Sequence, residues 1–338
     1  MKNSKTARKY LGLLLTLIFI IFLVFYIKEN IQTFAKIKNI SLPILALVFI
    51  ANIAYIYLNG IFLKIVLEPF KIKLEEPFLL SAGSSFINLI APFRAGAGAR
   101  AIYLKKKYEL SYSNFTSSLF GNYVISFLLS SITALIIFGI LYFQSGIFNG
   151  IITLIFLGIF SFCILVLLNI KFETKRFQII NNIIEGWKKI KTHPKTILKL
   201  ILNNIFGIIV GVATTYLIFE SLNIQINIFQ VIYFSVMGVL ATFINITPGS
   251  LGITEGIFAI SSQVLGFDPA IGVLVALTIR AINSSILIII GPIANYLLYK
   301  NLKKGISQSS LQSTAKKKLS ISMGNRSKIG IMTNQKSN

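Results

Sequence analysis

The sequence predicts an all-α polytopic membrane protein with about six full transmembrane helices, two re-entrant helical hairpins and an inverted internal repeat. Three observations favour this class. The 338 residues are 55% hydrophobic and only 13% charged, the mean hydropathy is +0.78, and nearly charge-free runs recur along the chain. A water-soluble domain carries about a quarter charged residues. The net charge of +23 therefore bears on membrane topology, and no nucleic-acid partner is predicted.

Six apolar runs are candidates for full crossings, because a helix needs about 20 residues to span about 30 Å of hydrocarbon. The first run follows a basic segment, but no small-residue cleavage site comes after it. We therefore interpret it as a retained anchor rather than a signal peptide. The six runs are Leu11–Ile27, Pro43–Leu63, Phe115–Phe143, Gly150–Ile170, Ile197–Phe219 and Ala270–Tyr299.

Two further runs, Pro77–Phe93 and Gly256–Phe267, are short for a crossing. If both belong to hairpins that enter the membrane and return, at about 77–107 and 228–266, the basic residues follow the positive-inside rule. Of the 33 basic residues, 27 then face the cytoplasm, and only three lysines before Pro43 lie outside. This topology predicts a multi-pass protein of the cell membrane with cytoplasmic N- and C-termini.

An internal repeat supports the two hairpins. The tripeptide Phe86-Ile87-Asn88 recurs as Phe243-Ile244-Asn245, Pro92 recurs as Pro248, and Ser130-Ser131-Ile132 recurs as Ser284-Ser285-Ile286. The repeats cover about residues 77–143 and 228–299, within one transmembrane domain of residues 1–300. By parity the first enters from the cytoplasm and the second from outside, which is the inverted arrangement of many secondary transporters.

Two polar segments complete the organisation. Residues 301–338 are rich in Ser and Lys without apolar periodicity, which predicts a basic, disordered cytoplasmic tail that contacts anionic lipid. The segment Arg176–Ile190 has apolar residues at helical spacing, which predicts a helix lying flat on the cytoplasmic surface.

Four ionisable residues fall at membrane depth, where a charge persists mainly by pairing or by lining a wet cavity. Arginine forks suit phosphate, and helices broken by Gly and Pro aim backbone N–H groups at an anion. We therefore predict a substrate site from the residues that flank the two hairpin turns and from one arginine in the last span. The predicted binding residues are Arg94, Arg100, Glu255, Arg280, Asn88 and Asn245, with the motif residues Pro92, Gly96, Gly98, Pro248, Gly249, Gly252 and Gly256.

Other interpretations stay open for each of these residues. Arg94 and Arg100 also fit snorkelling to headgroups, and Arg280 with Glu255 fits a structural ion pair. The small residues 95–99 fit close helix packing, and the two asparagines fit helix caps. With one Cys and one His in the chain, neither a metal site nor another cofactor is predicted.

The two turns resemble a known family. The run Pro92-Phe-Arg94-Ala-Gly96-Ala-Gly-Ala-Arg100 resembles its Pro-x-Arg-x-Gly-Glu-x-x-Arg element, and the run from Pro248 through Gly252 to Glu255-Gly256 resembles its Pro-x-x-x-Gly-x-x-Glu-Gly element. Over about residues 8–300 the chain resembles the lysylphosphatidylglycerol synthase transmembrane-region family, a flippase-like family. Two departures are Ala97, where an acidic residue is expected, and Thr254, where many relatives are basic.

The resemblance implies the membrane half that moves a lipid between leaflets, without the soluble aminoacyl transferase domain of some members. We expect a transporter rather than an enzyme, for an anionic lipid or a polyprenyl phosphate. Its arginines would hold phosphate, while Glu255 would bind a cationic headgroup or latch Arg280. The alternatives are an integral-membrane enzyme acting on a lipid-linked phosphate or sugar, and a non-transporting accessory subunit of a lipid-synthesising partner enzyme.

Overall fold

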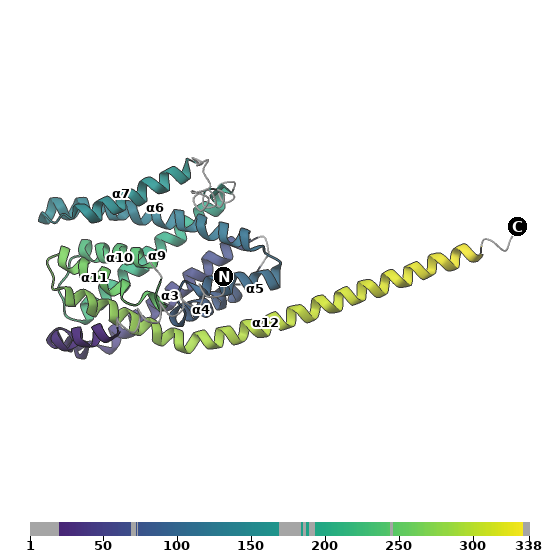
Figure 1. Cartoon of the computed structure of the whole chain (residues 1–338), viewed down its shortest axis with the longest axis horizontal. Coiled ribbons are helices and arrows are strands. Elements are labelled where there is room, and N and C mark those ends of the chain that lie inside the picture. Colours follow the sequence, from purple (N-terminus) through teal and green to yellow (C-terminus); the bar gives the residue numbers. More distant parts are fainter. Residues whose placement is uncertain are drawn as a thin grey trace, which may run out of the picture.

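The computed structural model describes residues 20–68, 72, 74–168, 184, 187–188, 193–243 and 246–333, and within these residues the regular structure is helical (Figure 1). Five of the described helices are long and apolar enough to cross a membrane. They coincide with five of the six predicted spans, as candidates by length and composition. The sixth, Leu11–Ile27, lies mostly outside the described residues, although residues 20–29 are helical. The five are α3 (Leu42–Val66), α6 (Tyr112–Ser145), α7 (Gly150–Leu167), α9 (Pro194–Ser221) and the part Pro269–Lys303 of α12 (Pro269–Thr333).

Two pairs of shorter helices occupy the positions of the predicted hairpins. The first pair is α4 (Glu75–Ile90) and α5 (Ala95–Tyr108); the second is α10 (Ile228–Phe243) and α11 (Ile253–Val264), joined through the 3₁₀ turn η4 (Pro248–Ser250). None of the four helices is among those long enough to span. A helix–turn–helix pair is therefore present at each site, whereas entry into the membrane and return stays a prediction.

The helices pack in a pattern that two halves of the chain share. α3 contacts α4 as α9 contacts α10, and α4 contacts α12 as α10 contacts α6. Likewise α3 contacts α12 as α9 contacts α6, and α3 and α9 contact each other. If α3, α4 and α6 are matched with α9, α10 and α12 in that order, each of these contacts in one half has its counterpart in the other. In Figure 1, α6 and α7 run side by side as a separate layer above α9, α10 and α11.

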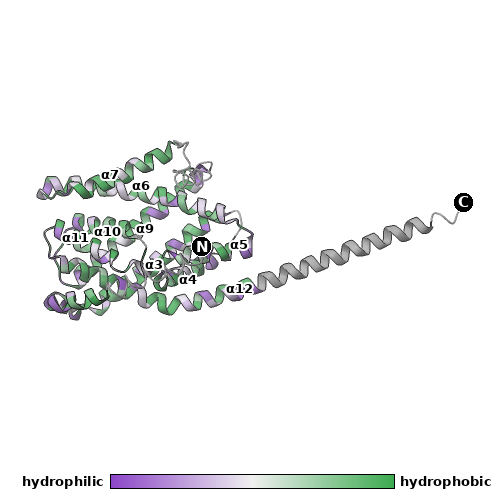
Figure 2. Cartoon of the chain, viewed as in Figure 1, coloured by the Kyte–Doolittle hydropathy of each residue, from purple (hydrophilic) through white to green (hydrophobic). Residues whose placement is uncertain are grey.

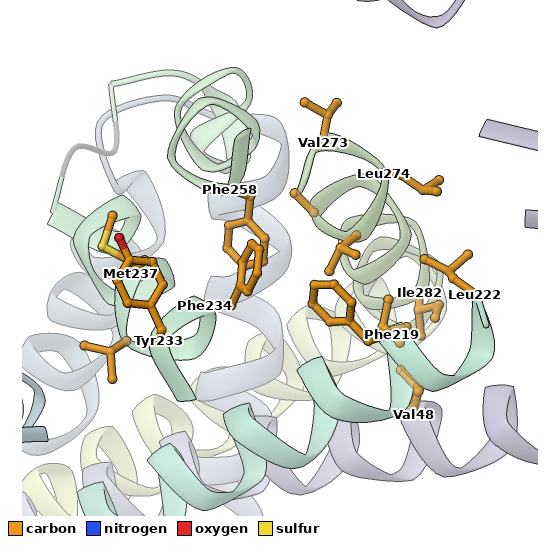
Figure 3. Packing of buried hydrophobic residues seen from close by; sticks show 14 of the residues in the cluster. Val48, Phe219, Leu222, Tyr233, Phe234, Met237, Phe258, Val273, Leu274 and Ile282 are labelled. Carbon is orange, nitrogen blue, oxygen red and sulfur yellow. The ribbon is translucent and has the colours of Figure 1, made fainter. Parts of the chain in front are cut away.

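The second helix pair is held by an aromatic row. The rings of Phe219 on α9 and Phe234 on α10 lie 5.0 Å apart, and those of Phe234 and Phe258 on α11 lie 5.6 Å apart (Figure 3). Outward-facing residues are also apolar: Phe143 is 86% exposed and Ile151 75% (Figure 2). Such surfaces suit lipid, in which helix association depends on packing rather than on hiding apolar area.

The structure draws α12 as one helix to Thr333 (Figure 1), and the disordered tail expected for residues 301–338 stays a prediction. A helix that is already formed extends without a new nucleation cost, and this segment contains no proline before Thr333. The predicted surface helix Arg176–Ile190 lies outside the described residues except for Ile184, Trp187 and Lys188.

Two short elements precede α3, namely α2 (Ile31–Phe34) and the 3₁₀ helix η1 (Ala35–Asn39). They connect the helical residues 20–29 to the first complete span. Of these two elements, α2 contacts α12.

Candidate functional site

The two hairpin turns share one backbone conformation. Pro92 is followed by two residues with positive φ, Phe93 at 58° and Arg94 at 52°. Pro248 is likewise followed by a pair with positive φ, Gly249–Ser250, at 59° and 57°. Left-handed backbone costs a non-glycine residue about 1–2 kcal/mol. The repeat seen in the sequence thus extends to the geometry of the two tips, which we call tip 1 (residues 91–94) and tip 2 (residues 244–252, of which 246–252 are described).

At tip 1, Arg94 faces a large cavity. Its Nη1 donates to the hydroxyl of Tyr123 on α6 at 2.7 Å, and its guanidinium carbon lies 5.1 Å from the centre of that ring. Both residues line a cavity of about 1050 Å³ between α6, α7, α10 and α11. Among the described residues that line it, Arg94 alone is charged, and Ile and Phe are the commonest of the others. We call this space the lipid-sized cavity.

The start of α5 explains two more motif residues. Asn88 Oδ1 accepts a hydrogen bond from the Gly96 backbone N–H at 2.8 Å, so Asn88 caps α5. A Cβ on Gly96 would overlap the Ser84 carbonyl oxygen of α4, whereas Gly98 has open space around it. Gly96 therefore permits close packing of α4 and α5, which was one of its two interpretations. The counterpart of Asn88, Asn245, lies outside the described residues.

At tip 2, a buried ion pair holds the turn together. Glu255 is 1% exposed; its Oε1 accepts from Arg280 Nε at 2.6 Å and its Oε2 accepts from the Gly252 N–H at 2.8 Å. Arg280 also donates to the carbonyl oxygens of Gly249 at 2.7 Å and Ser250 at 3.3 Å. The interpretation of Arg280 and Glu255 as an ion pair thus fits the geometry, and both side chains are occupied in this conformation.

The remaining site residues divide between the tips. Gly252, at φ 86°, is the N-cap of α11, and Gly256 one turn later has open space. Tip 2 packs against the end of α4, where a Cβ on Gly249 would lie 3.5 Å from Leu89 Cδ1. The structure therefore places tip 2 against the end of α4, which directly precedes tip 1, with Arg280 and Glu255 on the side of tip 2.

Arg100 lies apart from Arg94. Its Nε donates to Ser84 Oγ, and it lines a smaller cavity of about 280 Å³ between α4, α5 and α12, together with Lys106. Arg100 does not line the lipid-sized cavity. The structure thus places the two arginines of the first motif in two different cavities.

These two cavities use equivalent positions of the two helix pairs. α4 and α10 begin 153 residues apart, at Glu75 and Ile228, and α5 and α11 begin 158 apart, at Ala95 and Ile253. At those offsets, each residue of the second pair lining the lipid-sized cavity has a counterpart lining the smaller one. The matched positions are Ser84 with Met237, Ile87 with Leu240, Ala99 with Ile257 and Ile102 with Ile260.

Sequence reasoning missed two residues. Tyr123 carries no motif that marks it among 13 tyrosines. Glu76, which is 9% exposed, accepts hydrogen bonds from Tyr103 at 2.6 Å, Tyr108 at 2.7 Å and Lys107 at 2.8 Å, closing the base of the first helix pair. Burial and then the bond to Glu76 raise the pKa of Tyr108, so its hydroxyl stays a donor. An acidic residue at a helix start was the available signal for Glu76.

The fold and these sites define a multi-pass helical membrane protein with two similar helix pairs, the second of which packs its turn against the end of α4. The comparisons with known proteins agree. The family model described as Lysylphosphatidylglycerol synthase TM region matches residues 10–291, so the chain belongs to that family. It is 29% identical over 231 residues to a UPF0104 membrane protein of Methanocaldococcus jannaschii, covering 65% of this chain and 97% of that protein. No solved structure matches the chain.

Proposed function

We propose that this protein is a flippase that moves an anionic or phosphate-bearing lipid between leaflets, with Arg94 as its phosphate-binding residue. One observation carries the proposal: among the described lining residues, a single arginine is the charged group of an otherwise mainly apolar cavity of about 1050 Å³. A lipid has the same division of polarity, with a phosphate at one end and acyl or prenyl chains at the other. A guanidinium binds phosphate in a fork, and here Tyr123 orients it.

The occupied carboxylates favour a carrier over an enzyme. Among the described residues, the buried carboxylates are Glu76 and Glu255. Glu76 accepts from two tyrosines and a lysine, and Glu255 accepts from Arg280 and from a backbone N–H. A general base needs lone pairs within reach of its substrate's proton. Neither side chain is placed to supply them in this conformation.

The shared packing pattern suggests how the lipid would move. We propose that both helix pairs are re-entrant and that the halves form an inverted repeat, so the lipid-sized cavity and the smaller cavity open toward opposite leaflets. Lys106 at the cytoplasmic end of α5 and Arg100 would then receive the phosphate on that side. Rocking of the halves would alternate access, and the Arg280–Glu255 pair would latch tip 2 in the present state.

A reconstitution assay tests the proposal. In proteoliposomes, tail-labelled phosphatidic acid, phosphatidylglycerol or a short polyprenyl phosphate is offered in one leaflet, and loss of signal to a membrane-impermeant quencher reports transfer. Arg94→Ala is expected to slow transfer at least about tenfold, the weight of one charge-assisted contact, and Arg94→Lys less so. Lys64→Ala, which removes an exposed charge at the end of α3, is the control. Equal rates for wild type and Arg94→Ala would overturn the proposal.

The accessory-subunit alternative predicts a different result from the same preparation. In that case the purified protein moves none of the lipids alone, and transfer or lipid synthesis appears only when a co-purifying synthase is added back.

A further inference from the structure

A second cavity is lined largely by polar residues, whereas the lipid-sized cavity is lined mainly by apolar ones. It measures about 340 Å³ and lies between α3, α6, α9, α10 and α12, with α11 at one end. Its lining includes six asparagines and six serines or threonines but no charged residue. We call it the polar cavity. Its asparagines are Asn52, Asn59, Asn122, Asn203, Asn204 and Asn283.

The hydrogen bonds of these side chains leave both donors and acceptors for a ligand, because each asparagine amide has two hydrogens and its oxygen has two lone pairs. Asn52 and Asn59 each donate an amide hydrogen to the carbonyl four residues earlier, at 2.8 and 3.0 Å. Asn204 donates both to Leu200 O and to Asn122 Oδ1. A hydroxyl has one hydrogen, and those of Thr214, Thr215 and Ser235 are likewise given to their own helices.

One acceptor is already buried without a partner. Asn203 Oδ1 is inaccessible and accepts no hydrogen bond within the described part of the chain. Because that atom is out of reach, a ligand would instead meet the amide hydrogens and oxygens that the other lining asparagines, among them Asn52, Asn59 and Asn122, leave over. The polar cavity thus suits a ligand whose groups both donate and accept hydrogen bonds.

The absence of charge among the described lining residues limits which class of ligand fits the polar cavity. An anion is disfavoured because no basic residue is among the described residues that line the cavity. An ammonium group at membrane depth requires a compensating carboxylate, and none lines the cavity. The nearest candidate by sequence is Glu255, beside the lining residue Thr254, and both of its oxygens are occupied by Arg280 and Gly252. The ligand that fits is uncharged and rich in hydroxyl groups.

The polar cavity adjoins the lipid-sized cavity across a shared wall. On α6, Asn122 and Ser126 line the polar cavity. Their neighbours along the chain, Tyr123 and Phe127, line the lipid-sized cavity. We propose that the polar cavity receives a sugar or polyol headgroup of the transported phosphate-bearing lipid. This rests on the proposed function and names its substrate class; it replaces the cationic headgroup that the sequence suggested for Glu255.

Binding in detergent tests this independently of transport. Native mass spectrometry compares phosphatidylinositol with phosphatidic acid of the same acyl chains on purified wild type and variants. Wild type is expected to bind phosphatidylinositol about tenfold more tightly, as two neutral hydrogen bonds would give.

Asn52→Leu/Asn59→Leu should abolish that preference without weakening the binding of phosphatidic acid. Thr214→Val/Thr215→Val, an isosteric change, is a second variant that should reduce it. Asn30→Leu, which removes the same intrahelical bond outside the cavity, should leave it intact.

The outcomes separate the two proposals. Equal binding of the two lipids by wild type, or a preference that survives in both cavity variants, overturns the polar-cavity assignment whether or not transport occurs. A preference lost in the cavity variants, with no transfer in proteoliposomes, supports the assignment and contradicts the flippase. Free myo-inositol at millimolar concentration should leave bound phosphatidylinositol in place; displacement would overturn the lipid source in favour of a soluble polyol.

Discussion

Tip 1 and tip 2 share a pair of positive-φ residues after a proline, but their arginines are bound differently. At tip 2, glycines occupy two of the positions with positive φ, and Arg280 and Glu255 satisfy each other and the turn carbonyls. At tip 1, two non-glycine residues hold positive φ, and the arginine there donates to the hydroxyl of Tyr123 and lines a large cavity. Tip 2 is therefore held by its own ion pair, whereas tip 1 keeps the Arg94 guanidinium available to a ligand.

The difference shows that equivalent positions of a repeat need not share a function. Strain and an incompletely neutralised charge at tip 1 oppose stability, and such features collect at functional sites. A compact buried pair at tip 2 suits a structural role or a latch. The substrate-binding charge should therefore be sought at tip 1, and each prediction below alters one tip toward or away from the other.

The largest effect is expected from breaking the lock at tip 2. Glu255→Gln leaves Arg280 as a mostly buried charge without its partner, which destabilises a protein by about 3–5 kcal/mol. Thermal unfolding in detergent measures it. The exposed pair Lys199–Glu68 is the matched control, because Glu68→Gln should cost no more than about 1 kcal/mol. Similar small losses in both variants would show that tip 2 is not locked by its ion pair.

A smaller effect is expected from the two glycines after tip 1. Gly96→Ala places a Cβ against the Ser84 carbonyl, and overpacking of this kind costs about 1–3 kcal/mol. Gly98→Ala meets open space and should gain up to about 1 kcal/mol from helix propensity. The same unfolding assay compares them. A loss of stability in Gly98→Ala, or none in Gly96→Ala, would contradict the packing between α4 and α5.

The sequence was sufficient to locate five helices long and apolar enough to span and the two shorter helix pairs, because charge-free length and basic-residue counts are local properties. It also paired Arg280 with Glu255 as one of two interpretations, since opposite charges at depth require partners. It could not separate Arg94 from Arg100: six residues apart on a turn and helix, they enter different cavities only because α4 and α12 pack where they do. Tyr123 and the polar cavity depend on contacts between distant helices, which one sequence does not reveal.

Ala97→Glu tests the comparison from the other direction, by giving tip 1 the carboxylate of tip 2. Ala97 is the third residue of α5 after its N-cap Arg94, as Glu255 is the third of α11 after its N-cap Gly252, and both caps have positive φ. A glutamate at this position can accept from the Arg94 backbone N–H, as Glu255 accepts from Gly252. The expected gain in unfolding free energy is about 0.5–1 kcal/mol.

The same glutamate should weaken the proposed phosphate site, because its charge lies beside the Arg94 guanidinium. Transfer of phosphatidic acid in proteoliposomes is expected to fall several-fold in Ala97→Glu, although the protein is more stable. Ala97→Gln separates the two effects, since the amide can cap α5 without adding charge. If Ala97→Gln slowed transfer as much as Ala97→Glu, the loss would come from bulk at tip 1 rather than from neutralising Arg94, and the electrostatic difference between the tips would not explain their roles.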